Sequence, residues 1–362
     1  RYMDHYGPDG EFNENPAYAN SSFLPALYFS ALRYHRREPE PSPQLAALRR
    51  HCYWCLYATA PPGHLVSFGD GGPEYPALTS FFAAVAAAIQ DPVLQWFYLT
   101  HGSPPRFPVW ELLWLDDRLA PQAPTPARVP LGSAYQAHSG LISSRTSWAP
   151  ASTPCVVFGK TGHGGINHTH PDGGQVEIHG HGQRLIVDLG SVSYPGSDHR
   201  RYYHFNSDGH NQLTFGGRPQ IWNDDAAHRA RLLASDFDDD SGGWWRVDLT
   251  DLHEGVGRVT RTVVHLFPGF VAVLDEATLL TTEEARLRWH PVCDPELGDH
   301  GHFTVRTEAA SLQALVARVD GDLPVLQLGH HEYRPPYDRD RMGNPLPQRR
   351  EPYLDAAVTA ET

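Results

Sequence analysis

Apolar residues recur at helical spacing along the first third of the chain. Leu45 and Leu48 are one turn apart, and four other stretches before residue 120 show the same three- to four-residue period. Asp91-Pro92 adds a start signal, because aspartate caps a helix and proline suits its first turn. The long glycine- and proline-rich loops between these stretches suit a helical barrel with working loops at one end. The pattern predicts helices over 20–35, 43–58, 77–90, 91–100 and 109–115.

Beyond residue 130 the pattern changes to alternation of apolar and polar positions. Residues 175–179 alternate, and residues 259–275 predict a hairpin that turns at Pro268-Gly269. Many short strands with glycine-containing turns indicate an antiparallel β-sandwich. Residues 121–130 carry four prolines and predict a linker between the two halves. Residues 335–353, rich in proline and arginine, are expected to form a loop or a tail on the outside. The sequence therefore predicts an α+β multidomain chain.

Composition narrows the classes of partner. The chain has 362 residues, enough for two cores, and a net charge of −13, which argues against a nucleic-acid partner. A local cluster of histidine and arginine can still line a site for an acidic sugar. No apolar run approaches the ~20 residues of a membrane helix, so no membrane partner is expected. Cys52 and Cys55 form a lone C-x-x-C on a predicted helix, which favours plain buried cysteines over zinc.

Histidine is concentrated between His163 and His210. This segment holds eight of the 22 histidines, whereas even spreading would place about three there. On a strand, His168 and His170 would point to the same side. Two imidazoles and one carboxylate suit zinc with a fourth position for water, and we choose His170, Asp188 and His210 as ligands. A hydrogen-bonded His–Asp pair without metal is the alternative. We expect His179 and His181 to be exposed turn residues.

These motifs resemble the heparinase II/III-like polysaccharide lyases. That family joins an incomplete α/α toroid to an antiparallel β-sandwich, so the resemblance implies that residues 1–120 are the C-terminal part of a toroid, 121–130 a linker and 131–362 the sandwich. It also implies structural Zn²⁺ on the three ligands chosen above, with Tyr18 and His168 as catalytic residues. The resemblance rests on H168-x-H-x-D-x-G174, Gly182, D188-L-G-x-x-x-Y194, Tyr203, H210-N211, R145-x-x-W148 and the loop D9-G-E-F-N-E-N-P-A-Y18.

A uronate lyase removes the C5 proton beside the carboxylate and expels the C4 oxygen, which needs a base, an acid and neutralisation of the carboxylate. Tyr18 is expected to serve as acid or base, and His168 as base or carboxylate partner. Glu14, Arg201 and Tyr203 are the expected substrate-binding residues. Each has a plainer alternative: an aromatic at a helix start for Tyr18, a capping residue for Glu14, a solvated charge for Arg201 and sandwich packing for Tyr203.

The family's carboxylate-neutralising asparagine would precede Arg1, so we expect an upstream portion with that residue. Two rival functions stay open: a carbohydrate-binding protein without turnover, and a cupin-type metal oxygenase that uses His168, His170 and Glu177. The partner is expected to be an acidic polysaccharide or oligosaccharide whose identity is open. A periplasmic or secreted location is favoured, and a homo-oligomer is compatible with the sequence.

Overall fold

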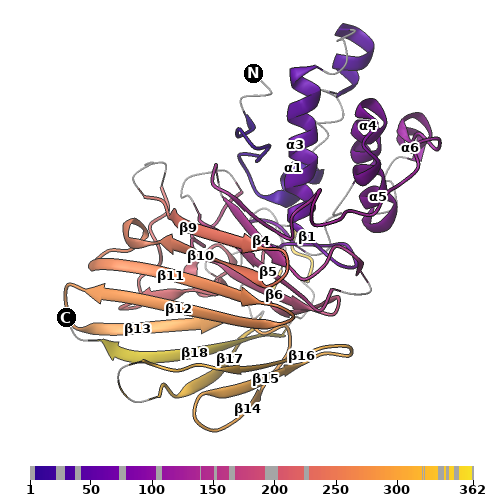
Figure 1. Ribbon diagram of the computed structural model, residues 1–362. Helices are drawn as coiled ribbons and strands as arrows, with labels where there is room; N and C mark the ends of the chain where they lie inside the picture. The colour runs from indigo at the N-terminus through magenta and orange to yellow at the C-terminus, as the bar shows by residue number, and fades with distance from the viewer. Residues whose placement is uncertain are drawn as a thin grey trace.

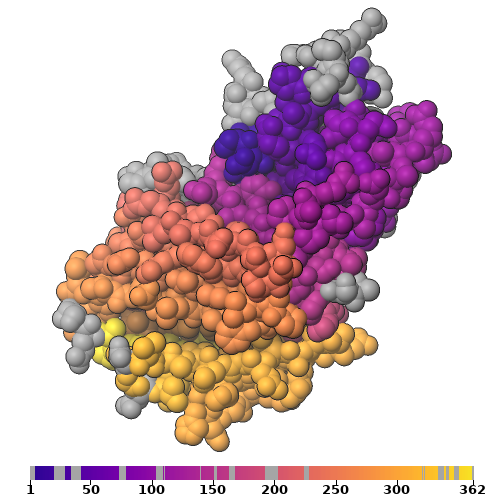
Figure 2. All heavy atoms as spheres, viewed as in Figure 1, coloured from indigo at the N-terminus to yellow at the C-terminus, as the bar shows by residue number. Residues whose placement is uncertain are grey.

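The computed structural model shows a group of short helices seated on a larger assembly of β-sheets (Figure 1). In the space-filling view, the helical part projects from one end of the wider β part (Figure 2). The structure describes residues 5–21, 29–36, 42–72, 79–102, 108–138, 140–150, 153–162, 168–191, 203–223, 228–319, 321, 323–332, 338–339, 342–345 and 350–360.

The helices begin where the sequence provides caps. Ser42 accepts a hydrogen bond from Leu45 N (3.1 Å) at the start of α3, and Asp91 accepts from two backbone amides at the start of α5. Arg49 on α3 forms an ion pair with Asp91 (2.8 Å), which ties the two helices together. The helical elements are α1 (Pro16–Ser21), the π-helix η2 (Ala31–Arg36), α3 (Pro43–Tyr57), α4 (Ser80–Ile89), α5 (Pro92–His101) and α6 (Pro108–Trp114).

Within the described residues, all strand pairs are antiparallel and the strands form five sheets. The five-stranded sheet has the hydrogen-bonded order β3 (Gly132–Tyr135), β4 (Leu141–Arg145), β5 (Cys155–Gly159), β6 (Val176–Gly180) and β7 (Gln183–Ile186). One four-stranded sheet has the order β12 (Phe270–Leu279), β11 (Val256–Leu266), β10 (Gly242–Asp248) and β9 (Arg231–Asp238), and the other has the order β17 (Leu326–Glu332), β18 (Arg350–Ala360), β13 (Glu283–Trp289) and β8 (Leu213–Phe215). The two smaller sheets are β14 (Glu296–Leu297), β15 (His302–Arg306) and β16 (Ser311–Leu315), and β1 (Thr59–Ala60) with β2 (His64–Leu65).

The five-stranded sheet is the middle layer of the molecule. Leu141 and Phe158 belong to the core shared with the helices, whereas Ile142 and Val157 belong to the core shared with the other sheets. Alternate residues of the same strands therefore face two different cores, and β4, β5 and β6 are buried along their whole length. This sheet is what positions helix-borne residues against sandwich-borne ones.

Several expectations hold and others need correction. The four helices expected between 43 and 115 are present, as is the hairpin of β11 and β12. The described helices are too few to form an α/α toroid, so the N-terminal region is a helical group only. The 335–353 segment is not merely an outer loop or tail, because it ends in β18, a strand flanked by β17 and β13. None of the described helices is both long and apolar enough to cross a membrane.

Candidate active site

His168 is held at the junction between the helical group and the sandwich. It has a left-handed backbone (φ 60°) rather than the strand conformation that the sequence suggested. Its carbonyl accepts hydrogen bonds from Asn15 Nδ2 (2.8 Å) and Asp70 N (3.0 Å), both from the helical group. A Cβ at Gly69 would lie 2.4 Å from this carbonyl oxygen, so only glycine permits the approach. The backbone of His168 is thus fixed by the opposite half of the molecule.

Tyr18 and Glu14 contact the His168 ring from the helical side. The Tyr18 and His168 rings are stacked, with centroids 3.8 Å apart and planes 12° from parallel. Glu14 Oε2 lies 3.0 Å from His168 Nδ1, and the two side chains keep 20% and 14% of their surface exposed. Asn15 Oδ1 accepts from Tyr18 N (3.1 Å), which caps the first turn of α1. We call Glu14, Tyr18 and His168 the junction triad; it combines an acid–base pair with partial access to solvent.

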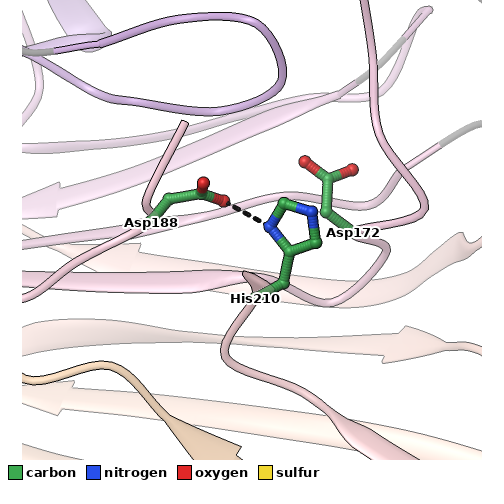
Figure 3. A group of neighbouring side chains, drawn as sticks. All are labelled: Asp172, Asp188 and His210. Atoms are coloured by element: carbon green, nitrogen blue, oxygen red, sulfur yellow. Dashed lines mark hydrogen bonds and ion pairs between the residues drawn. The ribbon is translucent and has the colours of Figure 1, made fainter. Parts of the chain in front are cut away.

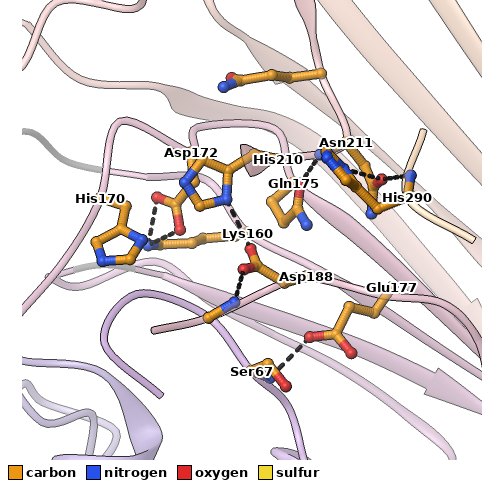
Figure 4. Close-up of polar contacts among 12 residues, drawn as sticks. Ser67, Lys160, His170, Asp172, Gln175, Glu177, Asp188, His210, Asn211 and His290 are labelled. Atoms are coloured by element: carbon orange, nitrogen blue, oxygen red, sulfur yellow. Dashed lines mark hydrogen bonds and ion pairs between the residues drawn. The ribbon is translucent and has the colours of Figure 1, made fainter. Parts of the chain in front are cut away.

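A second group of polar side chains is buried (Figure 4). All but one of its members come from one end of the middle sheet, where β5 ends, β6 begins and β7 ends, whereas His210 precedes β8 of another sheet. We call this group the sealed cluster, and its members are Lys160, His170, Asp172, Asp188 and His210.

Asp188 and His210 are in direct contact within the sealed cluster. Asp188 Oδ2 lies 3.0 Å from His210 Nδ1, and its Oδ1 accepts a hydrogen bond from Gly190 N (2.7 Å). Asp172 lies beside them, so that one ligand atom from each of the three residues falls within 4.8 Å of the others (Figure 3). This geometry brings together two of the three ligands predicted from the sequence.

His170 faces the same place but is turned toward the helical group. Its Nε2 lies 3.0 Å from Asp70 Oδ1, and its ring centroid lies 5.3 Å from that of His210. His170 Nδ1 and His210 Nε2 are both buried and have no hydrogen-bond partner in the part of the chain that the structure describes. A buried ring nitrogen without a partner is costly, so each imidazole has one nitrogen suited to a ligand that the protein itself does not supply.

Lys160 is the single lysine among 29 basic residues of the chain. Its ammonium is buried and lies 2.6 and 2.8 Å from the two carboxylate oxygens of Asp172. A lysine is a compact point charge, whereas the arginine used elsewhere carries a planar fork. The ion pair means that Asp172 is already neutralised by the protein.

Burial and neighbouring charges move the pKa values of the cluster in different directions. Burial lowers the pKa of His170 and outweighs its hydrogen bond to Asp70, which favours the neutral ring. Burial also opposes ionisation of His210, but the charge and hydrogen bond of Asp188 outweigh it and raise the pKa. Burial disfavours the charged Asp172, but Lys160 outweighs this and lowers the pKa of that carboxyl. The cluster therefore favours charged pairs around a neutral His170.

The side chains of the sealed cluster are of the types that hold a zinc-type ion, because imidazole nitrogen and carboxylate oxygen are its usual ligands. Among the described residues, the ligand atoms that lie within 4.8 Å of one another come from Asp172, Asp188 and His210, and His170 is not among them. Asp172 is also bound by Lys160, and His170 has an unpartnered Nδ1 and a ring centroid 5.3 Å from that of His210.

The remaining predicted residues lie elsewhere or are more buried than expected. Tyr203 is buried, with its ring stacked on His331 (3.5 Å) and its hydroxyl 3.3 Å from His290 Nε2. Its packing matches the plainer alternative of a sandwich residue. Arg201 lies outside the described residues. His181 is exposed as expected, but the expectation for His179 is wrong, because it is buried.

The cupin-type arrangement is not formed. Glu177 accepts a hydrogen bond from Ser67 N (2.7 Å) and contacts His179 Nε2 (3.0 Å). It does not converge on His170, and it serves instead to tie the middle sheet to the helical group. The rival function as a cupin oxygenase therefore has no support in the geometry.

Sequence reasoning missed three residues of the site: Asn15, Asp70 and Lys160. Asn15 precedes the proline of a helix start, which is the position of an N-cap. Asp70 lies in a glycine-rich loop, where close approach by another backbone is common. The singularity of Lys160 was a signal in the sequence itself, because a lone lysine among arginines suggests a position that requires an ammonium.

Comparison with known proteins supports the relationship that the motifs suggested. Residues 151–342 match the family model described as heparinase II/III-like, C-terminal. This range is more than half of the chain, and the protein therefore belongs to the heparinase II/III-like family. No curated protein matches the sequence.

The fold is similar to that of solved lyases. The heparan sulfate lyase HepC from Pedobacter heparinus superposes with a TM-score of 0.74 at 16% identity, covering 99% of this chain and 52% of HepC. A heparinase III structure gives a TM-score of 0.74 at 14% identity, with 99% of this chain and 53% of that chain covered. This chain thus spans about half the length of those lyases, and the likeness establishes a shared fold.

Proposed function

We propose that the protein is a polysaccharide lyase that cleaves a uronic-acid-containing polysaccharide by β-elimination. The observation that carries the proposal is the junction triad, in which the Tyr18 ring stacks on the His168 imidazole and the Glu14 carboxylate contacts that imidazole. Membership of the heparinase II/III-like family and the fold shared with heparan sulfate lyases support it.

Glu14 orients His168 for proton transfer. Its carboxylate contacts Nδ1, which favours the tautomer with the proton on Nδ1 and leaves Nε2 as the nitrogen that acts as base. The left-handed turn at His168 and the two hydrogen bonds to its carbonyl fix where that nitrogen lies. A fixed ring lowers the cost of reaching the geometry for abstraction of the C5 proton.

Tyr18 is the partner acid. As C5 loses its proton, the C4–oxygen bond breaks, and the leaving oxygen takes a proton from the Tyr18 hydroxyl group. Stacking keeps the Tyr18 ring against His168, so acid and base approach the sugar from one side. The product carries a C4–C5 double bond, which absorbs ultraviolet light.

Zn²⁺ held by His170, Asp188 and His210 is a second part of the proposal. The support is that Asp188 and His210 are in contact and that His170 and His210 each have one buried ring nitrogen without a partner among the described residues. When bound, the ion would lock the His168–His170 loop against the segment that carries His210, which is a structural role. His170→Ala is then expected to lower metal content, measured by mass spectrometry, together with the thermal midpoint and activity. Unchanged stability with loss of turnover alone would point to a catalytic metal.

The lyase activity is tested by following ultraviolet absorbance of the unsaturated product with a panel of uronate polymers. Heparan sulfate, unsulfated uronate–hexosamine chains and alginate cover the main chemistries. We expect absorbance to rise with at least one polymer and Tyr18→Phe to abolish the rise. The assay should use a chain as long as the solved relatives. If that chain forms no product from any polymer, the result would favour the non-catalytic carbohydrate-binding alternative.

A further inference from the structure

A second polar pocket lies on the sandwich and shares no residue with the junction triad or the sealed cluster. Its volume is about 440 Å³, and it is formed by the segment before β9, the first residue of β9 and the 3₁₀ turn η6 (Thr250–Leu252). Its polar lining consists of His228, Arg229, Arg231, Thr250, Asp251 and His253.

Among the described residues, Arg229 is the charged group of this pocket for which no ion pair is found. Arg231 forms an ion pair with Asp251, so these two charges offset each other. Arg229 is exposed, and no carboxylate among the described residues forms an ion pair with it. A guanidinium group can hold a carboxylate or a sulfate through two parallel hydrogen bonds. The lining is therefore suited to an anionic group.

The other polar groups are placed by local contacts. His228 Nδ1 contacts the side-chain Oδ1 of Asn223 (3.0 Å), which fixes its ring. Asp251 follows Thr250 in a turn held by Asp248, whose carboxylate accepts from the Thr250 amide (2.9 Å). Neutral imidazole and carboxylate groups pair well with hydroxyl groups, so the pocket offers partners for a sugar ring as well as for its acid group.

Aromatic contacts connect the pocket to the sealed cluster. Ile221 lines the pocket and its amide binds Leu252 O (2.8 Å); the next residue, Trp222, keeps 40% of its surface exposed. The Trp222 ring packs edge-on against Phe205 (5.0 Å), whose ring packs against His170 (5.1 Å). An exposed indole offers a flat apolar surface with a polar edge. Trp222 therefore places an exposed aromatic ring next to a residue that lines the pocket.

We propose that this pocket is a distal subsite that binds an acidic sugar residue of a polysaccharide chain. Arg229 binds the carboxylate or sulfate, while Asp251 and His228 contact ring hydroxyl groups. The identity of the ligand rests on the proposed lyase function, but binding in the pocket does not require turnover.

The test is a binding measurement on the Arg229→Gln variant. Arg229 is exposed and unpaired among the described residues, so the substitution is expected to leave the fold intact. Calorimetry would use long uronate–hexosamine oligosaccharides, unsulfated and sulfated, with Tyr18→Phe as the common background to prevent cleavage. We expect the Kd to rise about tenfold, because a charge-assisted hydrogen bond is lost. Arg318→Gln, an exposed arginine after β16 with no ion pair among the described residues, is the matched control and should leave the Kd unchanged.

The two oligosaccharides separate the sources of the anion. Weaker binding of both supports recognition of the carboxylate, and weaker binding of the sulfated chain alone supports recognition of the sulfate. If Arg229→Gln and its Tyr18→Phe parent bind both oligosaccharides with equal affinity, the subsite is overturned. The subsite is also overturned if the parent binds neither oligosaccharide. If Tyr18-containing protein yields no unsaturated product while Arg229→Gln still loses affinity, the lyase proposal fails and the subsite stands.

Discussion

The junction triad and the sealed cluster contain neighbouring histidines, His168 and His170, on either side of Thr169. The two groups differ in their access to solvent and in how their charged side chains are paired. The junction triad keeps 14% to 20% of the His168 and Glu14 side chains exposed, and its contacts cross from the helical group to the sandwich. The sealed cluster is buried, and Lys160–Asp172 and Asp188–His210 pair almost all of its charge internally. One group is accessible to a substrate, and the other can only act through the position of its neighbours.

The contrast indicates why two histidines two residues apart serve different ends. The left-handed turn at His168 breaks the alternation, so the His168 ring meets Tyr18 while the His170 ring meets Asp70 and His210. Loss of a partner in a buried group leaves an uncompensated charge, whereas loss of an exposed catalytic group costs little stability. Stability and turnover should therefore respond to different substitutions.

The largest expected effect is the loss of stability in Lys160→Met. The substitution leaves the Asp172 carboxylate buried without its ammonium, which costs roughly 3–5 kcal/mol of unfolding free energy. Urea denaturation measures the change. Arg118→Gln removes a cation from an ion pair that is 87% exposed on the arginine side, and it should change the unfolding free energy far less. Equal losses in the two variants would contradict a sealed, charge-paired cluster.

Tyr18→Phe should have the opposite profile. It keeps the ring that stacks on His168 but removes the proton donor, so turnover should fall by roughly 10²–10⁴-fold while the unfolding free energy changes little. The readouts are product absorbance and urea denaturation on the same samples. Tyr53→Phe on α3 removes a hydroxyl group that binds Asp91, away from the junction triad, and should keep full turnover. Similar turnover in both variants would remove Tyr18 from the mechanism.

Acid should destabilise the protein through histidines that lie outside both groups. Burial lowers the pKa of His51, His101, His253 and His265 to about 4, so the folded state keeps them neutral. Between pH 6.5 and 4 the unfolded chain binds more protons, and stability is lost as the pH falls through this window. Each of these histidines lowers the unfolding free energy at pH 4 by at most about 3 kcal/mol.

Urea denaturation at several pH values measures this slope, and His265→Gln should flatten it. His265 is fully buried and contacts Ser144 Oγ through Nδ1, a contact that a glutamine amide can replace. An unchanged slope in this variant would mean that other groups govern the acid transition.

The sequence predicts the layers of the fold better than the strands of its middle sheet. Helices α3 and α5 follow from spacing and caps, because part of each helix contacts solvent and an amphipathic pattern remains. The strands β4 and β5 lie between two cores and carry apolar residues without clear alternation, so period two does not mark them. The strand β18 follows a proline- and arginine-rich stretch that suggested a loop.

The candidate site could be predicted only where one motif carries it. His168, His170, Asp188 and His210 share one segment, and the structure brings them near one another. Asn15 and Asp70 are far from them in sequence, and their roles depend on a backbone carbonyl and a ring nitrogen that only the fold brings within reach. The sequence predicts that Tyr203 contacts the substrate, with packing in the sandwich as the alternative; its ring is buried against His331, and its role in binding stays a prediction.

The smallest expected effect concerns Asn15, which connects α1, the helix that carries Tyr18, to the backbone of His168. Its Oδ1 caps α1 at Tyr18 N and its Nδ2 donates to His168 O. Asn15→Asp keeps the capping oxygen but loses the donor, so it should move His168 with little change to α1. Asn15→Ala loses both contacts and should cost about 1–2 kcal/mol of unfolding free energy. Turnover should fall in both variants, since both remove the hydrogen bond from Asn15 to the His168 carbonyl. If Asn15→Asp keeps full turnover while Asn15→Ala does not, the cap on α1 rather than the bond to His168 is what holds the triad together.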